Sequence, residues 1–221
     1  MATWMTHLRI ADKLLDRLPD LSPIEFIMGN MAPDSGTPNP DGMTFTPSVQ
    51  VSHYRQDDRS GKKNISIASF VEEYFTPTHR AAYNSRQFAF YLGYLIHLMT
   101  DMLWSDQIAG PILEAYSDNS THFWSDVKAN WLYLDRIYLK SHPGFRAFRA
   151  YLGSVGFPNT YIDHFGPEAF ENRRAYITDF YLQESPDSEK HCRYLTADTL
   201  DQFVESAAES IHKQLLEGGF L

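Results

Sequence analysis

The chain has 221 residues and a formal net charge of −9, with 43% hydrophobic residues, nine histidines and one cysteine. This length and apolar content exclude a wholly disordered chain and suffice for the core of one domain, while the acidic balance offers no basic surface for nucleic acid or an anionic membrane. A single cysteine excludes an internal disulfide and a multi-cysteine zinc site, so a bound metal would need histidine and carboxylate ligands.

The N-terminal part of the chain is predicted to form two helices. No basic region followed by an apolar stretch opens the sequence, so a secretory signal peptide is not indicated and we expect a cytoplasmic protein. Apolar residues at helical spacing predict a helix over residues 7–18. A second helix is expected to begin with Ser22 as N-cap, Pro23 at its first position and Glu25 completing a capping box. Gly29 suits a C-terminal cap of that helix.

Residues 31–64 differ from the rest because they carry four prolines and three glycines with little periodicity, which predicts a long loop. A compact domain rarely keeps such a loop unless it is functional or held by something. Helical patterns resume and predict helices over residues 65–75, 86–104, 106–116, 121–139, 144–152, 167–182 and 196–217. Strand-like alternation is scarce, and no repeat or linker is visible. The sequence therefore predicts an all-α multi-helix bundle forming a single domain over residues 1–221.

The strongest local pattern lies in the apolar run of residues 88–104, which is too short for a confident membrane span and contains His97 and Asp101. These two residues are four apart and so share one face of a helix that should be buried. An ionised carboxylate is costly there unless it is paired or bound to a metal, and imidazole with carboxylate makes a good zinc ligand pair. The alternative is a hydrogen-bonded pair, or an aspartate paired with a distant arginine; the pattern alone does not separate these readings.

Three further residues, each taken alone, do not indicate a metal ligand. His7 begins the apolar face of the first helix, Asp34 follows a helix end, and His53 lies in the long loop. Together they would explain how that loop is ordered, because a metal would tie it to the helical core.

These residues carry a resemblance. The segments Thr6-His7, Gly29-Asn30-Met31-Ala32-Pro33-Asp34-Ser35, Ser52-His53-Tyr54 and Gly93…His97…Asp101…Trp104 resemble the zinc-dependent phospholipase C family, whose all-α fold is shared with the fungal single-strand-specific zinc nucleases. The order His, Asp, His, then His-x-x-x-Asp matches the ligand order of the family. The match is closest to intracellular bacterial members.

The resemblance implies two zinc ions. The ligands of the first would be Asp34, His53, His97 and Asp101. Asp101 would bridge to the second zinc, which His7 would also hold. In secreted members a free N-terminal amine completes that second site, and removal of Met1 would place the Ala2 amine five residues before His7, so we expect this amine to be a ligand. Asp34 would also accept a proton from the attacking water, which makes it the candidate catalytic residue.

A third zinc in the secreted members needs a histidine shortly after the bridging aspartate, and residues 102–107 contain none. His122 and Asp126 have the spacing of the remaining ligands, and Asp135 is a rival candidate. The alternative is that His122 and Asp126 form a solvated pair at a helix start, where aspartate favours the helix dipole.

The expected function is that of a zinc-dependent phosphoric ester hydrolase, phospholipase C-like, in which a metal-activated water attacks a phosphoester of a small molecule or lipid. Diester and monoester substrates both remain open, and the same ligands could hold manganese or iron. The charge of −9 disfavours a nucleic acid substrate, and no transmembrane segment is expected. The alternative is a metal-stabilised helical binding or structural protein with a degenerate catalytic site.

Overall fold

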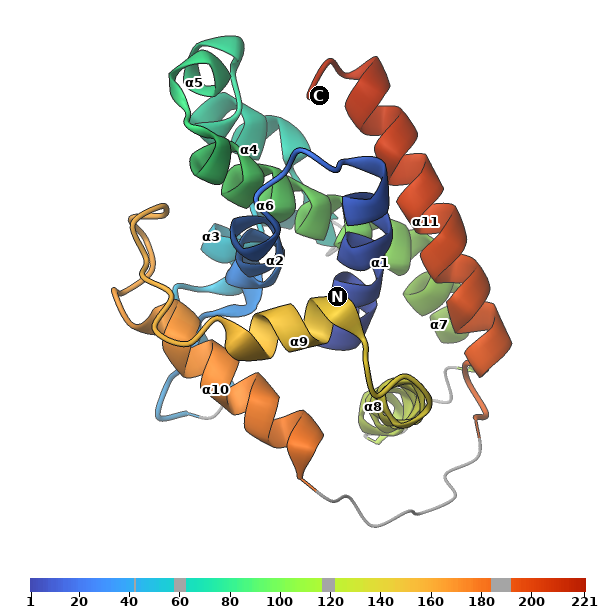
Figure 1. Cartoon of the computed structure of the whole chain (residues 1–221). Helices are drawn as coiled ribbons and strands as arrows, with labels where there is room; N and C mark the ends of the chain where they lie inside the picture. The colour runs from blue at the N-terminus through green and yellow to red at the C-terminus, as the bar shows by residue number, and fades with distance from the viewer. Residues whose placement is uncertain (42, 58–62, 117–121, 184–191) are drawn as a thin grey trace.

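The computed structural model describes residues 1–41, 43–57, 63–116, 122–183 and 192–221 (Figure 1). Its α-helices are α1 (Trp4–Arg17), α2 (Pro23–Met31), α3 (Val49–Ser52), α4 (Ile67–Tyr74), α5 (Pro77–Ala82), α6 (Ser85–Trp104), α7 (Gly110–Tyr116), α8 (Phe123–Ser141), α9 (Arg146–Gly153), α10 (Ala169–Leu182) and α11 (Ala197–Glu217). A 3₁₀ turn, η1 (Ala32–Asp34), follows α2, and a π-helical segment, η2 (Ser105–Ala109), follows α6. The predicted all-α class is confirmed.

Among the residues that the structure describes, strands are confined to two short antiparallel pairs within the predicted long loop and its end. β1 (Thr37–Pro38) pairs with β2 (Phe45–Thr46), with Thr37 opposite Thr46. β3 (Arg55–Asp57) pairs with β4 (Lys63–Ile65), with Gln56 opposite Asn64. With η1 and α3, these pairs give the segment after α2 more local structure than its proline and glycine content predicts.

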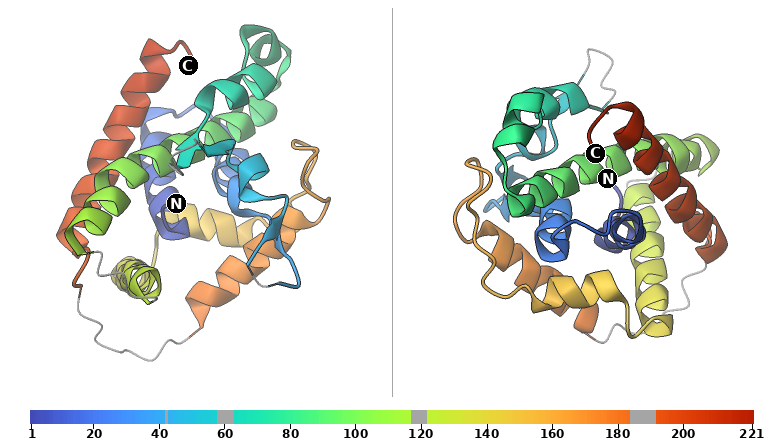
Figure 2. Two further views of the ribbon diagram at one scale, coloured as in Figure 1. Left: turned by 180° about the vertical axis from the view of Figure 1, so that it is seen from behind. Right: turned by 45° about the horizontal axis from the view of Figure 1, so that its top comes forward.

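Helix α6 is the centre of the fold, and every residue from Ala89 to Asp101 is buried. Its start is fixed by a capping box in which the Asn84 side chain accepts from backbone N–H groups and Gln87 bonds back to the Asn84 backbone. Helices α1, α2, α4 and α11 all contact α6, and the views of Figure 2 show α6 crossing the middle of the bundle. The prediction of a buried helix is confirmed, and no helix within the described ranges is long and apolar enough to cross a bilayer.

Two glycines allow α2 and α6 to approach closely. A Cβ atom on Gly29 would lie 2.0 Å from the Phe90 carbonyl oxygen, and one on Gly93 would lie 2.2 Å from the Phe26 carbonyl oxygen. Gly29 therefore lies inside α2 as a packing residue, and the prediction that it caps the C-terminus is wrong. The predicted capping box is also wrong, because Ser22 is the N-cap residue but its side chain makes no capping hydrogen bond.

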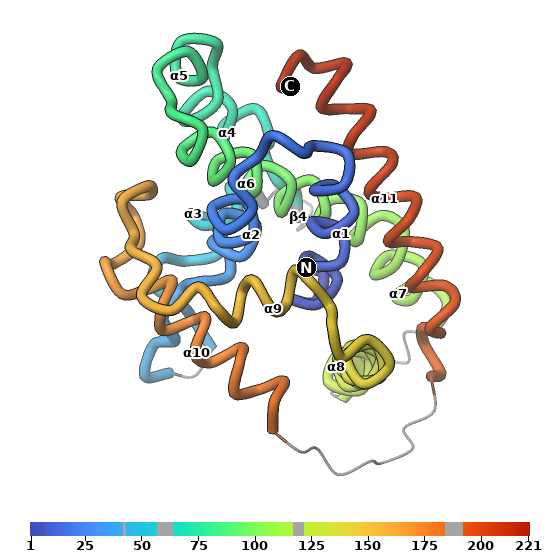
Figure 3. The backbone as a smooth tube through the Cα atoms, in the orientation of Figure 1, coloured from blue at the N-terminus to red at the C-terminus, as the bar shows by residue number. Residues whose placement is uncertain are grey.

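Helix α1 begins at Trp4, earlier than predicted, because the Thr3 side chain accepts a hydrogen bond from the Thr6 N–H and caps it. Figure 3 follows the chain from this N-terminus through α1 and α2 to the later helices α8, α9 and α10. Helix α9 packs on both α1 and α2, and α10 packs on α9. The predicted helix over residues 106–116 is divided into η2 and α7, and α5 has no counterpart among the predicted helices.

Candidate metal centre

Five side chains from four segments converge beside α6. They form two groups whose possible ligand atoms lie within 4.8 Å of one another, and the groups share His97. The first contains His7 of α1 with His97 and Asp101 of α6; the second contains Asp34 of η1, His53 at the end of α3, and His97. The structure thus brings together all five residues that the sequence predicts as metal ligands.

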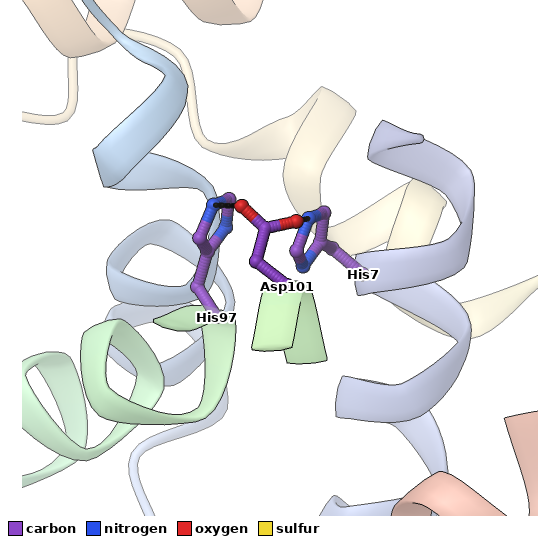
Figure 4. A group of neighbouring side chains, drawn as sticks. All are labelled: His7, His97 and Asp101. Atoms are coloured by element: carbon purple, nitrogen blue, oxygen red, sulfur yellow. Dashed lines mark ion pairs between the residues drawn. The ribbon is translucent and has the colours of Figure 1, made fainter. Parts of the chain in front are cut away.

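The Asp101 carboxylate lies between two imidazoles, as Figure 4 shows. Its Oδ1 atom is 3.4 Å from His7 Nε2, and its Oδ2 atom is 3.6 Å from His97 Nε2 and 3.7 Å from His53 Nε2. The backbone nitrogen of Ala2 donates to Oδ1 at 2.6 Å. Each carboxylate oxygen therefore faces a different set of nitrogen atoms, which is the arrangement that a bridging ligand requires.

The second group is built around facing ring nitrogens. His53 Nε2 lies 3.3 Å from Asp34 Oδ1 and 3.3 Å from His97 Nε2. The other nitrogen of His97, Nδ1, donates to the Asn30 carbonyl oxygen at 2.7 Å. This bond leaves Nε2 of His97 free to act as a ligand, because the position of the ring proton is set by the partner of the opposite nitrogen.

His53 is held from outside the cluster. Its Nδ1 atom lies 2.9 Å from the Ser52 hydroxyl, and the buried Tyr94 hydroxyl donates to the Ser52 carbonyl oxygen at 2.5 Å. Tyr54, the next residue, has a φ of +51°, a left-handed conformation that is uncommon for a residue with a side chain. The end of α3 is thus fixed by α6, and this fixes the direction of the His53 ring.

For three of the five ligand candidates the electrostatics favour the protonation state that a metal needs, whereas for His97 the contact with Asp101 outweighs burial and raises the pKa. Burial and the neighbouring His97 lower the pKa of His7 to about 4, so its ring is neutral at pH 7. Burial opposes ionisation of Asp34, but the contact with His53 and the other imidazoles lowers its pKa to about 2. For Asp101, burial is outweighed by the positive N-terminus and the two adjacent imidazoles, which hold its pKa well below the usual range.

Several atoms of the cluster lack hydrogen-bond partners. Both ring nitrogens of His7 and the Oδ2 atom of Asp101 are buried and unbonded within the described part of the chain. Such groups are rare in folded proteins because each one costs free energy. One cation beside Oδ1 would satisfy His7 Nε2 and another beside Oδ2 would satisfy that oxygen, and imidazole and carboxylate donors are those that zinc prefers. The residues therefore fit the metal that the sequence suggested.

The non-metal alternatives for the pair on α6 agree less well with the geometry. The His97–Asp101 separation of 3.6 Å is too long for a hydrogen bond. Across the described ranges, Asp101 forms ion pairs only with histidines, so no distant arginine neutralises it. Asp101 is nevertheless only 2% exposed. A buried carboxylate in these surroundings is best accounted for by a metal.

The candidate third site lies apart from this cluster. His122 is exposed at the N-cap of α8, and Asp126 is exposed in the first turn of the same helix. Neither belongs to the possible ligand groups found among the described residues. The rival candidate Asp135 is buried and accepts hydrogen bonds from Thr3 Oγ1 at 2.9 Å and Tyr181 Oη at 2.7 Å. A third metal held by His122 and Asp126 stays a prediction.

The residues that orient the ligands could not be assigned from the sequence. Asn30 and Ser52 fall inside the quoted motifs, but their roles depend on a carbonyl and a hydroxyl that only folding brings to His97 and His53. Tyr94 acts over a greater distance along the chain, and no spacing rule indicates it.

Comparison with known proteins agrees with this geometry. A family described as zinc dependent phospholipase C matches residues 6–207, a span that includes all five clustered ligand candidates. No curated protein and no solved structure matches the chain. Since the match covers most of the sequence, the chain belongs to the zinc-dependent phospholipase C family.

Proposed function

We propose that this protein is a zinc-dependent hydrolase of phosphoric esters, with residues 1–221 forming one phospholipase C-like domain. The observation that carries the proposal is the pair of buried ligand groups that share His97, with the Asp101 carboxylate facing both. A structural zinc site needs only one closed set of four ligands, whereas two adjacent sites are typical of phosphoester hydrolysis.

The residues divide between two ions. The proposed ligands of the first are Asp34, His53, His97 and Asp101. The second would take Asp101 and His7, with the Ala2 nitrogen as a further ligand once Met1 is removed. Bound zinc supplies a water of lowered pKa and stabilises negative charge on a phosphoryl oxygen.

The protein's own contribution rests on Asp34. Its side chain is 8% exposed, whereas the other four side chains of the cluster are at most 1% exposed. Asp34 is therefore the member of the cluster that solvent and a substrate can reach. Because its carboxylate is ionised at neutral pH, we propose that it orients the attacking water and accepts its proton.

The substrate class follows from charge. A formal charge of −9 opposes capture of a polyanion, so we propose a small-molecule or lipid phosphoester and not a nucleic acid.

The test combines metal analysis with turnover. Zinc per chain is measured in the purified protein, and p-nitrophenyl phosphomonoesters, phosphodiesters and phosphatidyl lipids are assayed before chelation, after chelation and after zinc is restored. We expect zinc-dependent turnover that Asp34→Asn abolishes. The control is Asp20→Asn, which removes an exposed carboxylate outside the cluster and should keep both zinc and turnover. Full zinc occupancy with no turnover on any ester would favour the metal-stabilised binding protein instead.

A further inference from the structure

Asp135 of α8 is a buried carboxylate outside the proposed metal centre. It is 1% exposed and accepts two hydrogen bonds, from Thr3 Oγ1 at 2.9 Å and from Tyr181 Oη at 2.7 Å. Among the residues that the structure describes, it forms no salt bridge and belongs to neither group of possible metal ligands. A buried carboxylate without a cation in contact is costly, and two hydrogen bonds offset only part of that cost. The two groups that it holds therefore indicate its role.

Thr3 is the group that links Asp135 to the N-terminus. The Thr3 hydroxyl accepts from the Thr6 N–H at 3.3 Å, and the Thr3 carbonyl oxygen accepts from the His7 N–H at 3.1 Å. A hydroxyl has one proton and two lone pairs, so this one donates to Asp135 while it accepts from Thr6. Thr3 is therefore fixed at both its side chain and its carbonyl, beside the turn that carries His7.

The Ala2 nitrogen lies one residue before this anchor. Ala2 is 8% exposed, and its nitrogen donates to Asp101 Oδ1 at 2.6 Å. The same oxygen faces His7 Nε2 at 3.4 Å, so the nitrogen points at the place proposed for the second ion. The first residues of a chain are usually poorly ordered unless something ties them down. Each residue has only two soft backbone torsions, so an anchored Thr3 leaves the Ala2 nitrogen few other positions.

Tyr181 of α10 fixes Asp135 from the other side. Tyr181 is 7% exposed, and its ring meets Trp4 edge to face with ring centres 6.2 Å apart. Trp4 is the first residue of α1 and follows Thr3 directly. Phe148 of α9 meets the same tyrosine ring edge to face at 5.8 Å. The carboxylate is thus oriented by a tyrosine that α9 and the start of α1 keep in place.

We propose that Asp135 is a positioning residue for the second metal site, which it serves by holding Thr3 and so directing the Ala2 nitrogen. The inference rests on the proposed function, which assigns that nitrogen as a ligand once Met1 is removed. Groups that orient a ligand without touching the metal commonly set its affinity. The alternative is a bridge that only fastens α8 and α10 to α1. The two roles differ in one respect, because positioning matters only while the Ala2 amine is free to bind.

The experiment is a double-mutant cycle on zinc binding, measured separately from turnover. Zinc affinities are determined by chelator competition for chains that start at the free Ala2 amine and for chains whose amine is blocked by an N-terminal extension, each with and without Asp135→Leu. In the free-amine form, Asp135→Leu should weaken binding of the second zinc about 10- to 100-fold. In the extended form, where the amine no longer contributes, the same substitution should change that affinity less than about threefold.

Two variants separate positioning from a general loss of stability. Asp135→Asn keeps an oxygen that accepts from Thr3 and should keep the zinc affinity. Asn130→Leu removes another buried anchor of α8, one that bonds residues 194 and 195, and should leave the zinc affinity unchanged. If Asp135→Leu does not fold, Thr3→Val breaks the same hydrogen bond from its other end in the same cycle, and Thr3→Ser restores the hydroxyl.

Equal losses of zinc affinity in the free-amine and extended forms would reduce Asp135 to a structural bridge and overturn the inference. Unchanged affinity in Asp135→Leu, or an extension that leaves zinc binding of the wild type intact, would also overturn it. A cycle that gives the expected losses in a protein without turnover on any ester would leave the inference standing and defeat the hydrolase. Turnover together with equal losses in both forms would do the opposite.

Discussion

The close contact between α2 and α6 makes Gly93→Ala the most informative single substitution. The added Cβ would lie 2.2 Å from the Phe26 carbonyl oxygen and 2.8 Å from the Asn30 backbone nitrogen. Both atoms belong to the backbone of α2 and cannot move without the helix. The two helices must therefore separate, and the Asn30 carbonyl that holds His97 Nδ1 must move with α2.

The expected loss in the free energy of unfolding follows from two opposing effects. Overpacking in a core costs about 1–3 kcal/mol, and the upper end applies because the obstacles are backbone atoms. Alanine is favoured over glycine inside a helix by about 1 kcal/mol, which offsets part of that cost. The expected net loss in the free energy of unfolding is about 2 kcal/mol. For a chain of this size that corresponds to a fall in Tm of roughly 4–8 °C.

The assay compares Gly93→Ala with a matched control, Gly153→Ala. Gly153 ends α9, and nothing lies within 4 Å of a Cβ built there, so this substitution should leave stability unchanged or raise it slightly. Urea denaturation and calorimetry give stability, and zinc analysis reports the displacement of Asn30. We expect Gly93→Ala to lose both stability and zinc affinity. Equal stability of the two variants would refute the packing argument.

Three further predictions concern the centre and its supports. His97→Ala and Asp101→Ala should each lower zinc content and Tm, because metal binding couples to folding; full zinc occupancy in either variant, measured by mass spectrometry, would refute the site. An N-terminal extension that retains Met1 should reduce zinc content relative to a chain that starts at the free Ala2 amine, and equal metal content in the two forms would exclude the amine as a ligand. Burial raises the pKa of Asp135 from 3.8 to about 7, so between these values the folded chain binds a proton that the unfolded chain does not, and the associated stability is lost as the pH rises through about 7. Relative to the wild type, Asp135→Asn should therefore gain up to about 4 kcal/mol in the free energy of unfolding as the pH rises from 4 to 8. Urea denaturation at several pH values measures this difference, and parallel pH profiles of the two proteins would contradict it.

Much of the candidate centre could be predicted because its ligands lie on or beside periodic helices. The apolar run around His97 and Asp101 indicates a buried helix, and a buried carboxylate needs a partner. The order of His7, Asp34 and His53 ahead of this pair then produced the resemblance to the family. Gly29 was misread for a physical reason: a glycine near a helix end satisfies the rule for a C-cap, and only the neighbouring helix reveals it as a packing residue.

The sequence by itself determined the helical class and the buried central helix, because burial and periodicity are local properties of a chain. The five candidate ligands came from the resemblance of its ordered motifs to the family. Only the tertiary structure decided how those ligands face one another, with Asp101 between His7 and His97. It also decided which groups orient them. These relations join residues from distant parts of the chain. Their distances depend on how α1, α2 and α6 pack, and no local pattern encodes that packing.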